Sequence, residues 1–410
     1  MKPSCPDRVV IISDFSTVRG GASQLAVSQA ALLSARGVPV TFFSGDATHD
    51  LPKGVSQVAV GGQRLLEGGR VSAALAGLWN RASSTLLADW IAQNDTAATI
   101  YHLHGYHQTL SPSVLAPLRR VRSRSVMHAH DYFLACPNGA FFDFRSGQTC
   151  GRAPLSFSCV MRNCDKRNYG HKLWRVARQT VQNTARRQLA PGVTTILLHD
   201  AMQARLFARR SPGGIRVIPN PAQAFLASPV AAERNSDLIY VGDIHSYKGV
   251  RLLACAGRQA GVQIRFVGDG QDKEALARDY PEHRFDGWQD RAGLCRIMAD
   301  ARILVAPTLG PEPYGLAPAE ALMSGIPVLI SDSMLLAGDI DTGGMGLRFA
   351  AGDRDDLARA LVTLAHDDGL VARLSRTARS NARDLSLSDE TWCDALLGLY
   401  GDILDRPAAR

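Results

Sequence analysis

Apolar segments of strand length alternate with helical patterns along this chain in two successive rounds. The first round contains RVVIISD (8–14), VPVTFFSG (38–45), TIYHLHG (99–105), RSVMHAHD (124–131) and TTILLHD (194–200). Helical patterns between them cover residues 23–37, 72–93 and 165–188. Strands that are joined through helices pair in parallel. This round therefore predicts a parallel sheet with helices on both faces.

A second round follows a linker of small and polar residues, PAQAFLASPVAAERNS (221–236). Its apolar segments are DLIYVGD (237–243), VQIRFVGDG (262–270), RILVAP (302–307) and PVLISD (327–332). The chain ends in an amphipathic helical pattern. With 410 residues there is enough chain for two full cores. We therefore predict an α/β protein with two doubly wound domains, residues 1–222 and 223–387, and a final segment, 388–410. In such folds the ligand is expected in the crevice between the domains.

Positive charge is concentrated between residues 116 and 190. This segment contains fourteen Arg or Lys and three Asp, a net charge of +11, whereas the whole chain carries +8. The asymmetry predicts an anionic partner such as phospholipid or a lipid pyrophosphate. Nucleic acid is disfavoured, because no recognised nucleic-acid motif accompanies the charge. A solvated basic face is the alternative.

The N-terminal sequence leads almost directly into the first strand, so we expect no secretory signal. No apolar run reaches the roughly 18 residues that a membrane span requires. These observations predict a cytoplasmic protein, in which the eight cysteines are reduced or bound to metal.

Two carboxylates eight positions apart, Glu312 and Glu320, lie in EPYGLAPAE between a buried strand and a helix. Pro318 suits the first position of that helix. Three backbone N–H groups then fall at the helix N-terminus as an anion site: those of Gly315, Leu316 and Ala317. Glu320, in the first turn, is expected to accept sugar or ribose hydroxyls, and Glu312, in the loop, to face whatever lies over the phosphate. The pattern indicates a phosphorylated sugar. The alternative is that Glu320 only favours the helix dipole and Glu312 is solvated.

Four cysteines, Cys136, Cys150, Cys159 and Cys164, fall within 29 residues of a segment with little regular periodicity. Four thiolates suit the tetrahedral geometry of a structural zinc ion, although the spacing is not a paired CxxC. We therefore predict a structural zinc in the insert 136–164, with free or redox-active thiols as the alternative.

Gly20 and Gly21 open the first helix and allow close approach of a phosphate.

The segment EPYGLAPAEALMSGIPVLISD (312–332) closely resembles the Glu-x7-Glu motif of family 4 retaining glycosyltransferases, EGFGLVPLEAMACGTPVV, with Tyr314 in place of the usual Phe. The resemblance covers nearly the whole chain. It implies the GT-B fold, in which two Rossmann-like domains face a central cleft. It also implies that the last helix, expected at 388–405, crosses back to the N-terminal domain.

The resemblance also implies roles for particular residues. Lys248 of YVGDIHSYKGV (240–250) matches the lysine that neutralises the donor diphosphate. Asp243 stands where the family has an arginine, and Arg251 or Arg265 is the expected substitute. His130 of HAHDYFLACPNG matches a histidine that lies against the donor sugar. Gly20 and Gly21 match the glycine loop near the diphosphate. His102 is expected to pack internally, and His104 and His107 to contact the acceptor.

The activity implied is transfer of a hexose-type sugar, with retention, from a nucleoside-diphosphate sugar to an acceptor hydroxyl. Bacterial surface polysaccharide or glycolipid synthesis is the implied setting. Catalysis would require no cofactor, and the basic segment favours an anionic, lipid-linked or saccharide acceptor at the inner membrane surface. The alternatives are a nucleotide-sugar epimerase of the same fold and a non-catalytic nucleotide-sugar-binding protein.

Overall fold

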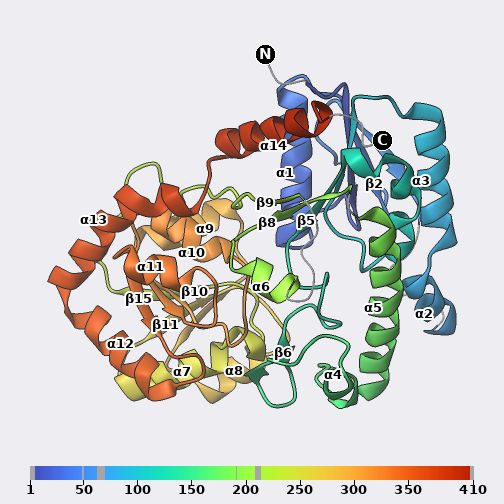
Figure 1. Cartoon of the computed structure of the whole chain (residues 1–410). Coiled ribbons are helices and arrows are strands. Elements are labelled where there is room, and N and C mark those ends of the chain that lie inside the picture. The colour runs from blue at the N-terminus through green and yellow to red at the C-terminus, as the bar shows by residue number, and fades with distance from the viewer. Residues whose placement is uncertain (1–4, 49, 62–69, 191, 208–213, 407–410) are drawn as a thin grey trace. The chain divides into compact units, whose positions relative to one another are not determined.

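The computed structural model describes residues 5–48, 50–61, 70–190, 192–207 and 214–406 (Figure 1). Contacts divide the chain into two compact units. Unit 1 comprises residues 1–139, 152–218 and 389–410, and unit 2 comprises residues 140–151 and 219–388. The predicted boundaries were 222/223 and 387/388. The main difference is the segment 140–151, which was expected in the N-terminal domain and belongs to unit 2.

Unit 1 is built on a seven-stranded sheet in the order β3-β2-β1-β4-β5-β8-β9, with every neighbouring pair parallel. The strands are β1 (Arg8–Ser13), β2 (Val40–Ser44), β3 (Val55–Ala59), β4 (Thr99–Leu103), β5 (Ser125–Ala129), β8 (Thr194–Leu197) and β9 (Ile215–Val217). The central strands are buried along almost their whole length. This burial explains their continuous apolar sequences.

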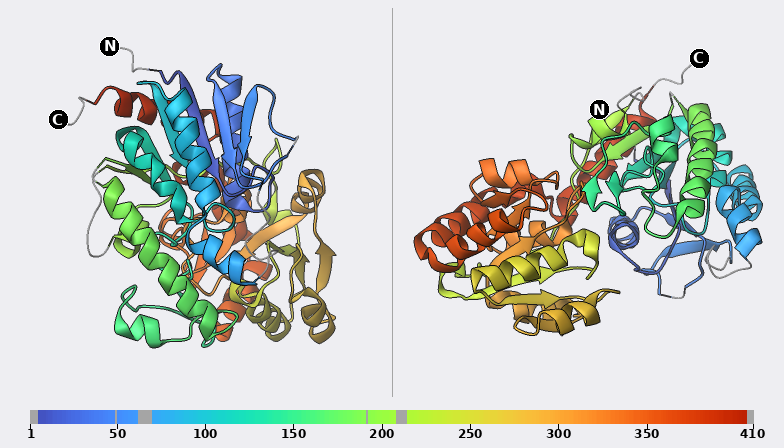
Figure 2. Two further views of the ribbon diagram at one scale, coloured as in Figure 1. Left: turned by 90° about the vertical axis from the view of Figure 1, so that its right-hand side faces the viewer. Right: turned by 90° about the horizontal axis from the view of Figure 1, so that it is seen from below.

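The helices of unit 1 are α1 (Gly21–Ala35), α2 (Arg70–Leu78), α3 (Arg81–Asn94), α4 (Phe157–Met161), α5 (Tyr169–Leu189), α6 (Met202–Leu206) and α14 (Asp389–Leu404), with 3-10 turns η1 (Pro112–Leu115) and η2 (Pro117–Arg124). The sheet lies between α1 on one side and α3 and α5 on the other (Figure 1). Figure 2 shows α3 and α5 covering the same face of this sheet. The sequence predicted one helix for residues 72–93, where the structure has two.

Unit 2 is built on a six-stranded parallel sheet in the order β12-β11-β10-β13-β14-β15. Its strands are β10 (Asp237–Val241), β11 (Ile264–Val267), β12 (Arg284–Gly287), β13 (Ala301–Ala306), β14 (Val328–Ser331) and β15 (Gly346–Phe349). The segment 140–151 adds a short antiparallel hairpin, β6 (Phe142–Asp143) and β7 (Gln148–Thr149). Strands β3, β9, β15 and this hairpin were not predicted, because they are short and partly exposed.

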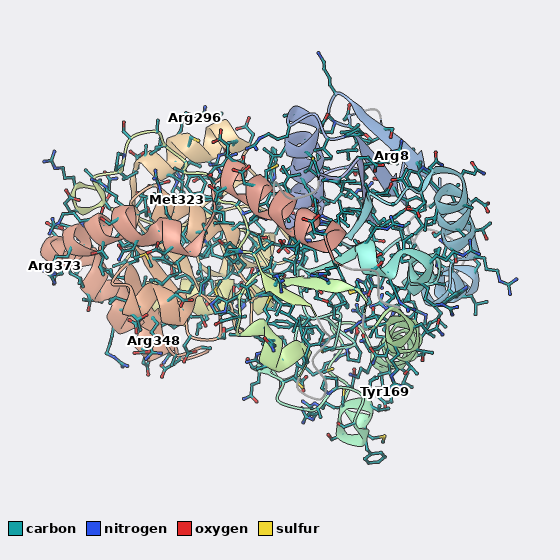
Figure 3. All side chains as sticks on the ribbon, turned by 45° about the horizontal axis from the view of Figure 1, so that its top comes forward. Arg8, Tyr169, Arg296, Met323, Arg348 and Arg373 are labelled. Atoms are coloured by element: carbon teal, nitrogen blue, oxygen red, sulfur yellow. The ribbon has the colours of Figure 1, made fainter. Side chains whose placement is uncertain are left out.

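The helices of unit 2 are α7 (Val250–Ala260), α8 (Lys273–Asp279), α9 (Arg291–Ala299), α10 (Leu316–Met323), α11 (Ala337–Thr342), α12 (Arg354–His366) and α13 (Asp368–Leu385), with 3-10 turns η3 (Ala232–Arg234) and η4 (Ser246–Lys248). Helix α10 packs against α13, and Figure 3 labels Met323 and Arg373 on these two helices. This packing fixes α10, the helix that follows the EPYG segment.

The last helix, α14, belongs to unit 1, where it contacts α1 (Figure 1). It is anchored by Trp392, Leu396 and Tyr400, which are completely buried. None of the described helices combines the length and the apolar composition needed to cross a membrane.

Candidate active site

The loop between β13 and α10 turns at Gly315, which has a φ of +95°. A Cβ at this position would meet Met334 Cε at 2.8 Å, so glycine is required both for the backbone conformation and for space. Helix α10 begins at Leu316, two residues earlier than predicted. Pro318 is therefore the third helical residue, where its missing N–H still costs nothing. Glu320 is the fifth helical residue and lies beyond the first turn, which corrects the predicted position.

Lys248 and Glu312 form an ion pair within unit 2. Lys248 Nζ lies 2.7 and 2.8 Å from the two carboxylate oxygens of Glu312, and Thr308 Oγ1 donates to the same carboxylate at 2.9 Å. The two side chains are only 20% and 25% exposed. Burial alone would raise the pKa of Glu312, but the Lys248 ammonium and the two hydrogen-bond donors outweigh it and lower the pKa. Glu312 is therefore ionised and holds the lysine in place.

Glu320 pairs with Arg291 at the start of α9, with Arg291 Nη1 2.7 Å from Glu320 Oε1. Burial raises the pKa of Glu320, and the Arg291 guanidinium opposes this effect. The other guanidinium nitrogen, Nη2, donates to the carbonyls of Gln223 and Ala224 at 2.8 Å each. Sequence analysis missed Arg291. The available signal was an arginine in the first turn of a helix, where it opposes the dipole.

Asp243, in the position of the family's arginine, is exposed and lies 3.4 Å from His245 Nε2. The two expected substitutes are engaged elsewhere. Arg251 pairs with Asp279 at 2.9 Å, and Arg265 pairs with both Asp237 and Asp286. Lys248 is therefore the one predicted diphosphate-binding cation that the structure places beside Glu312.

Tyr314 replaces the usual phenylalanine of the motif, and its hydroxyl has a structural role. The ring is buried, and the hydroxyl donates to the carbonyl of Leu385 at 2.8 Å and contacts Ser386 Oγ and the carbonyl of Asn220. Asn220 and Ser386 belong to the two segments where the chain passes between the units, 218/219 and 388/389. Tyr314 thus ties the EPYG loop to both connecting segments.

Gly20 and Gly21 lie at the start of α1 in unit 1. Helix α1 has no side-chain cap, and a Cβ at Gly20 would meet no atom within 4 Å. The space around Gly20 therefore leaves room for a ligand at the helix N-terminus, where backbone N–H groups attract anions.

His130 follows β5 in unit 1 and belongs to a chain of hydrogen-bonded side chains. Its Nε2 lies 2.8 Å from His104 Nδ1, and His104 Nε2 lies 2.6 Å from Gln29 Oε1. The amide nitrogen of Gln29, Nε2, lies 2.9 Å from His102 Nδ1 and 2.6 Å from the Tyr400 hydroxyl. Burial lowers the pKa of His130 to about 4, so this ring is neutral at neutral pH. Neighbouring Asp131 has its pKa raised to about 6 by burial.

His128 joins the same hydrogen-bonded series, because its Nδ1 lies 3.2 Å from His102 Nε2. One ring nitrogen from each of His102, His104 and His128 lies within 4.8 Å of the other two. Their rings are stacked or tilted by 18° to 35°, with centroids 4.6 to 5.3 Å apart. Both ring nitrogens of His102 and of His104 lie within hydrogen-bond distance of other side chains. The histidines are therefore part of a buried hydrogen-bonded cluster. His104 and His107 were expected at the acceptor. In the structure His104 is hydrogen-bonded to Gln29, and His107 is hydrogen-bonded to Gln182.

Asp14, at the end of β1, is a buried residue that sequence analysis missed. Its carboxylate accepts four backbone N–H groups, those of His107, Gln108, Thr109 and Leu110, at 2.6 to 3.0 Å. The Thr109 hydroxyl adds a fifth hydrogen bond at 3.0 Å. Asp14 therefore fixes the loop that follows β4. The sequence signal that could have identified Asp14 is its position as an acidic residue directly after the apolar strand β1.

The basic segment 116–190 is only partly a surface feature. Lys172 and Arg178 are buried, and Arg175 pairs with buried Asp165 at 2.8 Å. Arg124 forms two hydrogen bonds to Asp95. The exposed positive charge is therefore smaller than the sequence count implied, although Arg119, Arg120, Arg122, Arg152, Lys166 and Arg167 are exposed.

Known protein families and curated proteins match parts of this chain. Residues 235–367 match the family model for glycosyl transferases group 1. The phosphatidyl-myo-inositol mannosyltransferase of Mycobacterium leprae is 36% identical over 115 residues, which cover 27% of this chain and 31% of the relative. That of Mycolicibacterium smegmatis is 34% identical over 140 residues, covering 31% and 36%. The chain thus spans about a third of the length of these curated relatives.

Solved structures match over almost the whole chain. Sucrose-phosphate synthase from Thermosynechococcus elongatus has a TM-score of 0.70 at 16% identity, covering 97% of this chain and 99% of that one. Anabaena HepE in complex with UDP has a TM-score of 0.68 at 15% identity, covering 96% and 100%. The fold is therefore GT-B. The family model and the curated relatives each match part of the chain, in agreement with the resemblance to the family 4 glycosyltransferases.

Proposed function

We propose that this chain transfers a sugar from a nucleoside-diphosphate sugar to an acceptor hydroxyl, with retention of configuration. The observation that carries the proposal is the Lys248–Glu312 pair, which holds an ammonium on Glu312, a residue four positions before the first residue of α10. A departing diphosphate carries about two to three negative charges. Lys248 and the N–H groups of Gly315, Leu316 and Ala317 would stabilise that charge as the bond breaks. Because they supply positive charge, the proposal requires no catalytic cofactor.

The remaining roles are those that the resemblance implies. Glu320 would accept the ribose hydroxyls, and its pairing with Arg291 would orient the carboxylate. Glu312 would contact the donor sugar. The class of donor is supported by structural neighbours that bind UDP and UDP-glucose.

The first test is a thermal-shift panel of UDP, GDP, ADP and dTDP on the native chain and on Glu320→Ala. A nucleotide at a hundred times its Kd should stabilise the native protein by about 2.7 kcal/mol. We expect one nucleotide to do so, and the variant to lose most of this gain because the ribose hydroxyls lose their acceptor. Glu274→Ala, an exposed acid of unit 2, is the matched control. Equal stabilisation of native and Glu320→Ala proteins would contradict the assignment.

One observation favours a second candidate, a non-catalytic nucleotide-sugar-binding protein. Asp243 replaces a cation of the family, and Arg251 and Arg265 are paired with other carboxylates. Binding of a nucleotide in the panel, without release of nucleoside diphosphate from any donor sugar, would support this candidate over the transferase.

The proposed acceptor is anionic and lipid-linked, at the cytoplasmic surface of the membrane. Its support is a short helix with exposed apolar side chains: Phe157 is 83% and Met161 59% exposed, one turn apart on α4. Exposed Arg152, Lys166 and Arg167 are close to α4 in sequence. Apolar side chains beside basic ones suit insertion into an anionic membrane surface. The two curated relatives act on phosphatidyl-myo-inositol by name, which favours a glycolipid product.

We expect the double variant Phe157→Ser/Met161→Ser to bind anionic vesicles at least about tenfold more weakly than the native chain, because each buried apolar side chain contributes about 1.5 kcal/mol or more. Co-sedimentation with vesicles of anionic phospholipid measures this. Val362→Ser, which removes an exposed apolar side chain of unit 2, is the control. Native binding that persists unchanged in the double variant, or that loses no strength at high salt, would count against the membrane proposal.

A further inference from the structure

Lys172 places an ammonium group in the interior of unit 1. Its side chain is completely buried, at 0% exposure. Within the described residues, its Nζ forms hydrogen bonds only with sulfur atoms: Cys159 Sγ at 3.5 Å and Cys164 Sγ at 3.3 Å. A buried cation is costly unless an opposite charge compensates it. No described carboxylate pairs with Lys172, so the compensating negative charge must lie on the sulfurs.

A third thiol, that of Cys136, belongs to the same cluster. Asn138 lies between the cysteines, with Oδ1 3.0 Å from Cys136 Sγ and Nδ2 3.5 Å from Cys164 Sγ. All three cysteines are buried. They come from three separate places: the turn after β5, helix α4, and the connection from α4 to α5. Three thiols that are distant in this segment are thus gathered around one buried cation.

One ammonium does not balance several thiolates, and neutral thiols do not compensate a buried ammonium. A divalent cation among the sulfurs resolves both difficulties, because Zn²⁺ binds buried cysteine thiolates in a tetrahedron. We propose that Cys136, Cys159 and Cys164 are ligands of a structural zinc ion, with Lys172 as its counter-charge. Zinc with these three thiolates has a net charge of −1, which explains why a lysine is buried beside it. Cys150, the fourth cysteine of the sequence prediction, belongs to unit 2.

The metal would stabilise a segment that has little other structure. Helix α4 has only five residues, and too few hydrogen bonds to be stable alone. Cys159 lies on α4, and Tyr169, at the start of α5 (Figure 3), donates from its hydroxyl to the carbonyl of Val160 at 3.1 Å. A zinc ion joining Cys159 to Cys136 and Cys164 would fix α4 relative to α5. The inference does not depend on the proposed sugar transfer.

The test is elemental analysis of the full chain purified without chelator, together with cobalt substitution. We expect about one zinc per chain, and a cobalt-thiolate charge-transfer absorption after exchange. Cys136→Ser, Cys159→Ser and Cys164→Ser should each lose most of the zinc. Cys255→Ser, which changes a cysteine of unit 2, is the control and should keep one zinc. If a serine variant does not fold, the cobalt spectrum of the native chain decides.

The role of Lys172 has its own measurement. Lys172→Met should keep the ion but bind it about tenfold more weakly in competition with a chelator, as is usual when a group beside a metal site is lost. An unchanged zinc affinity would overturn the counter-charge. Absence of zinc from native protein prepared with zinc present, or a disulfide among these cysteines, would overturn the metal site.

Discussion

Replacing Lys248 by methionine is expected to lower the rate of sugar transfer by about a hundred- to a thousand-fold, the usual effect of removing a group that stabilises charge in the transition state. Methionine keeps the apolar length of the side chain and removes only the ammonium. The effect should appear mainly in kcat, because the charge on the diphosphate develops as the glycosidic bond breaks. Release of nucleoside diphosphate, followed in the presence of acceptor, measures it.

Because Lys248 and Glu312 are paired and half-buried, the single variant also leaves Glu312 without its counter-charge. The loss of one partner of such a pair destabilises the fold by up to about 3–5 kcal/mol. The double variant Lys248→Met/Glu312→Gln separates the two effects. It should recover most of the stability, because glutamine still accepts from Thr308, and none of the activity. Recovery of activity in the double variant would show that Lys248 is structural. Lys53→Met, an exposed lysine, is the control.

Replacing Asp14 by asparagine is expected to lower the free energy of unfolding of unit 1 by about 4 kcal/mol or more. The Asp14 carboxylate is the acceptor of four backbone N–H groups and one hydroxyl. An amide of the same shape has one acceptor oxygen and directs its NH₂ group at the remaining donors. Each buried donor left unpaired costs about 1–3 kcal/mol.

Urea denaturation followed by tryptophan fluorescence measures this change. Asp50→Asn, at an exposed position of the same unit, is the matched control and should change stability by less than about 0.5 kcal/mol. A result for Asp14→Asn within that same range would mean that the loop after β4 is held by other contacts.

The alternation of apolar strands and helical patterns was sufficient to predict two parallel sheets, because buried parallel strands have continuous apolar sequences. It failed for β3, β9, β15 and the hairpin 142–149, which lie at sheet edges or consist of two-residue strands. Short segments carry too little periodicity to be distinguished from loops. The assignment of the hairpin to unit 2 likewise depends on contacts that no local pattern contains.

The motif EPYGLAPAE predicted a strand-to-helix connection with a glycine turn, and the structure has both. It did not predict where α10 begins, since Pro318 is compatible with the first and the third helical positions. Of the residues that pair with the two glutamates, one could be predicted from the sequence and the other could not. Lys248 could be named from its own motif, whereas Arg291 lies in an unrelated helix and meets Glu320 only through packing.

The fold class, the two-domain organisation and the residues of the EPYG loop could be predicted, because they depend on local periodicity and on residues close together in the chain. Which groups compensate one another depends on the packing of distant elements: Arg291 with Glu320, Asp14 with the loop after β4, Lys172 with the cysteines, and Tyr314 with the two connecting segments. Each of these pairs joins residues between 8 and more than 90 positions apart. Pairing of buried polar groups is fixed by how the elements pack, and the physical demand that every buried charge and hydrogen-bonding group be satisfied can be applied only when that packing is known.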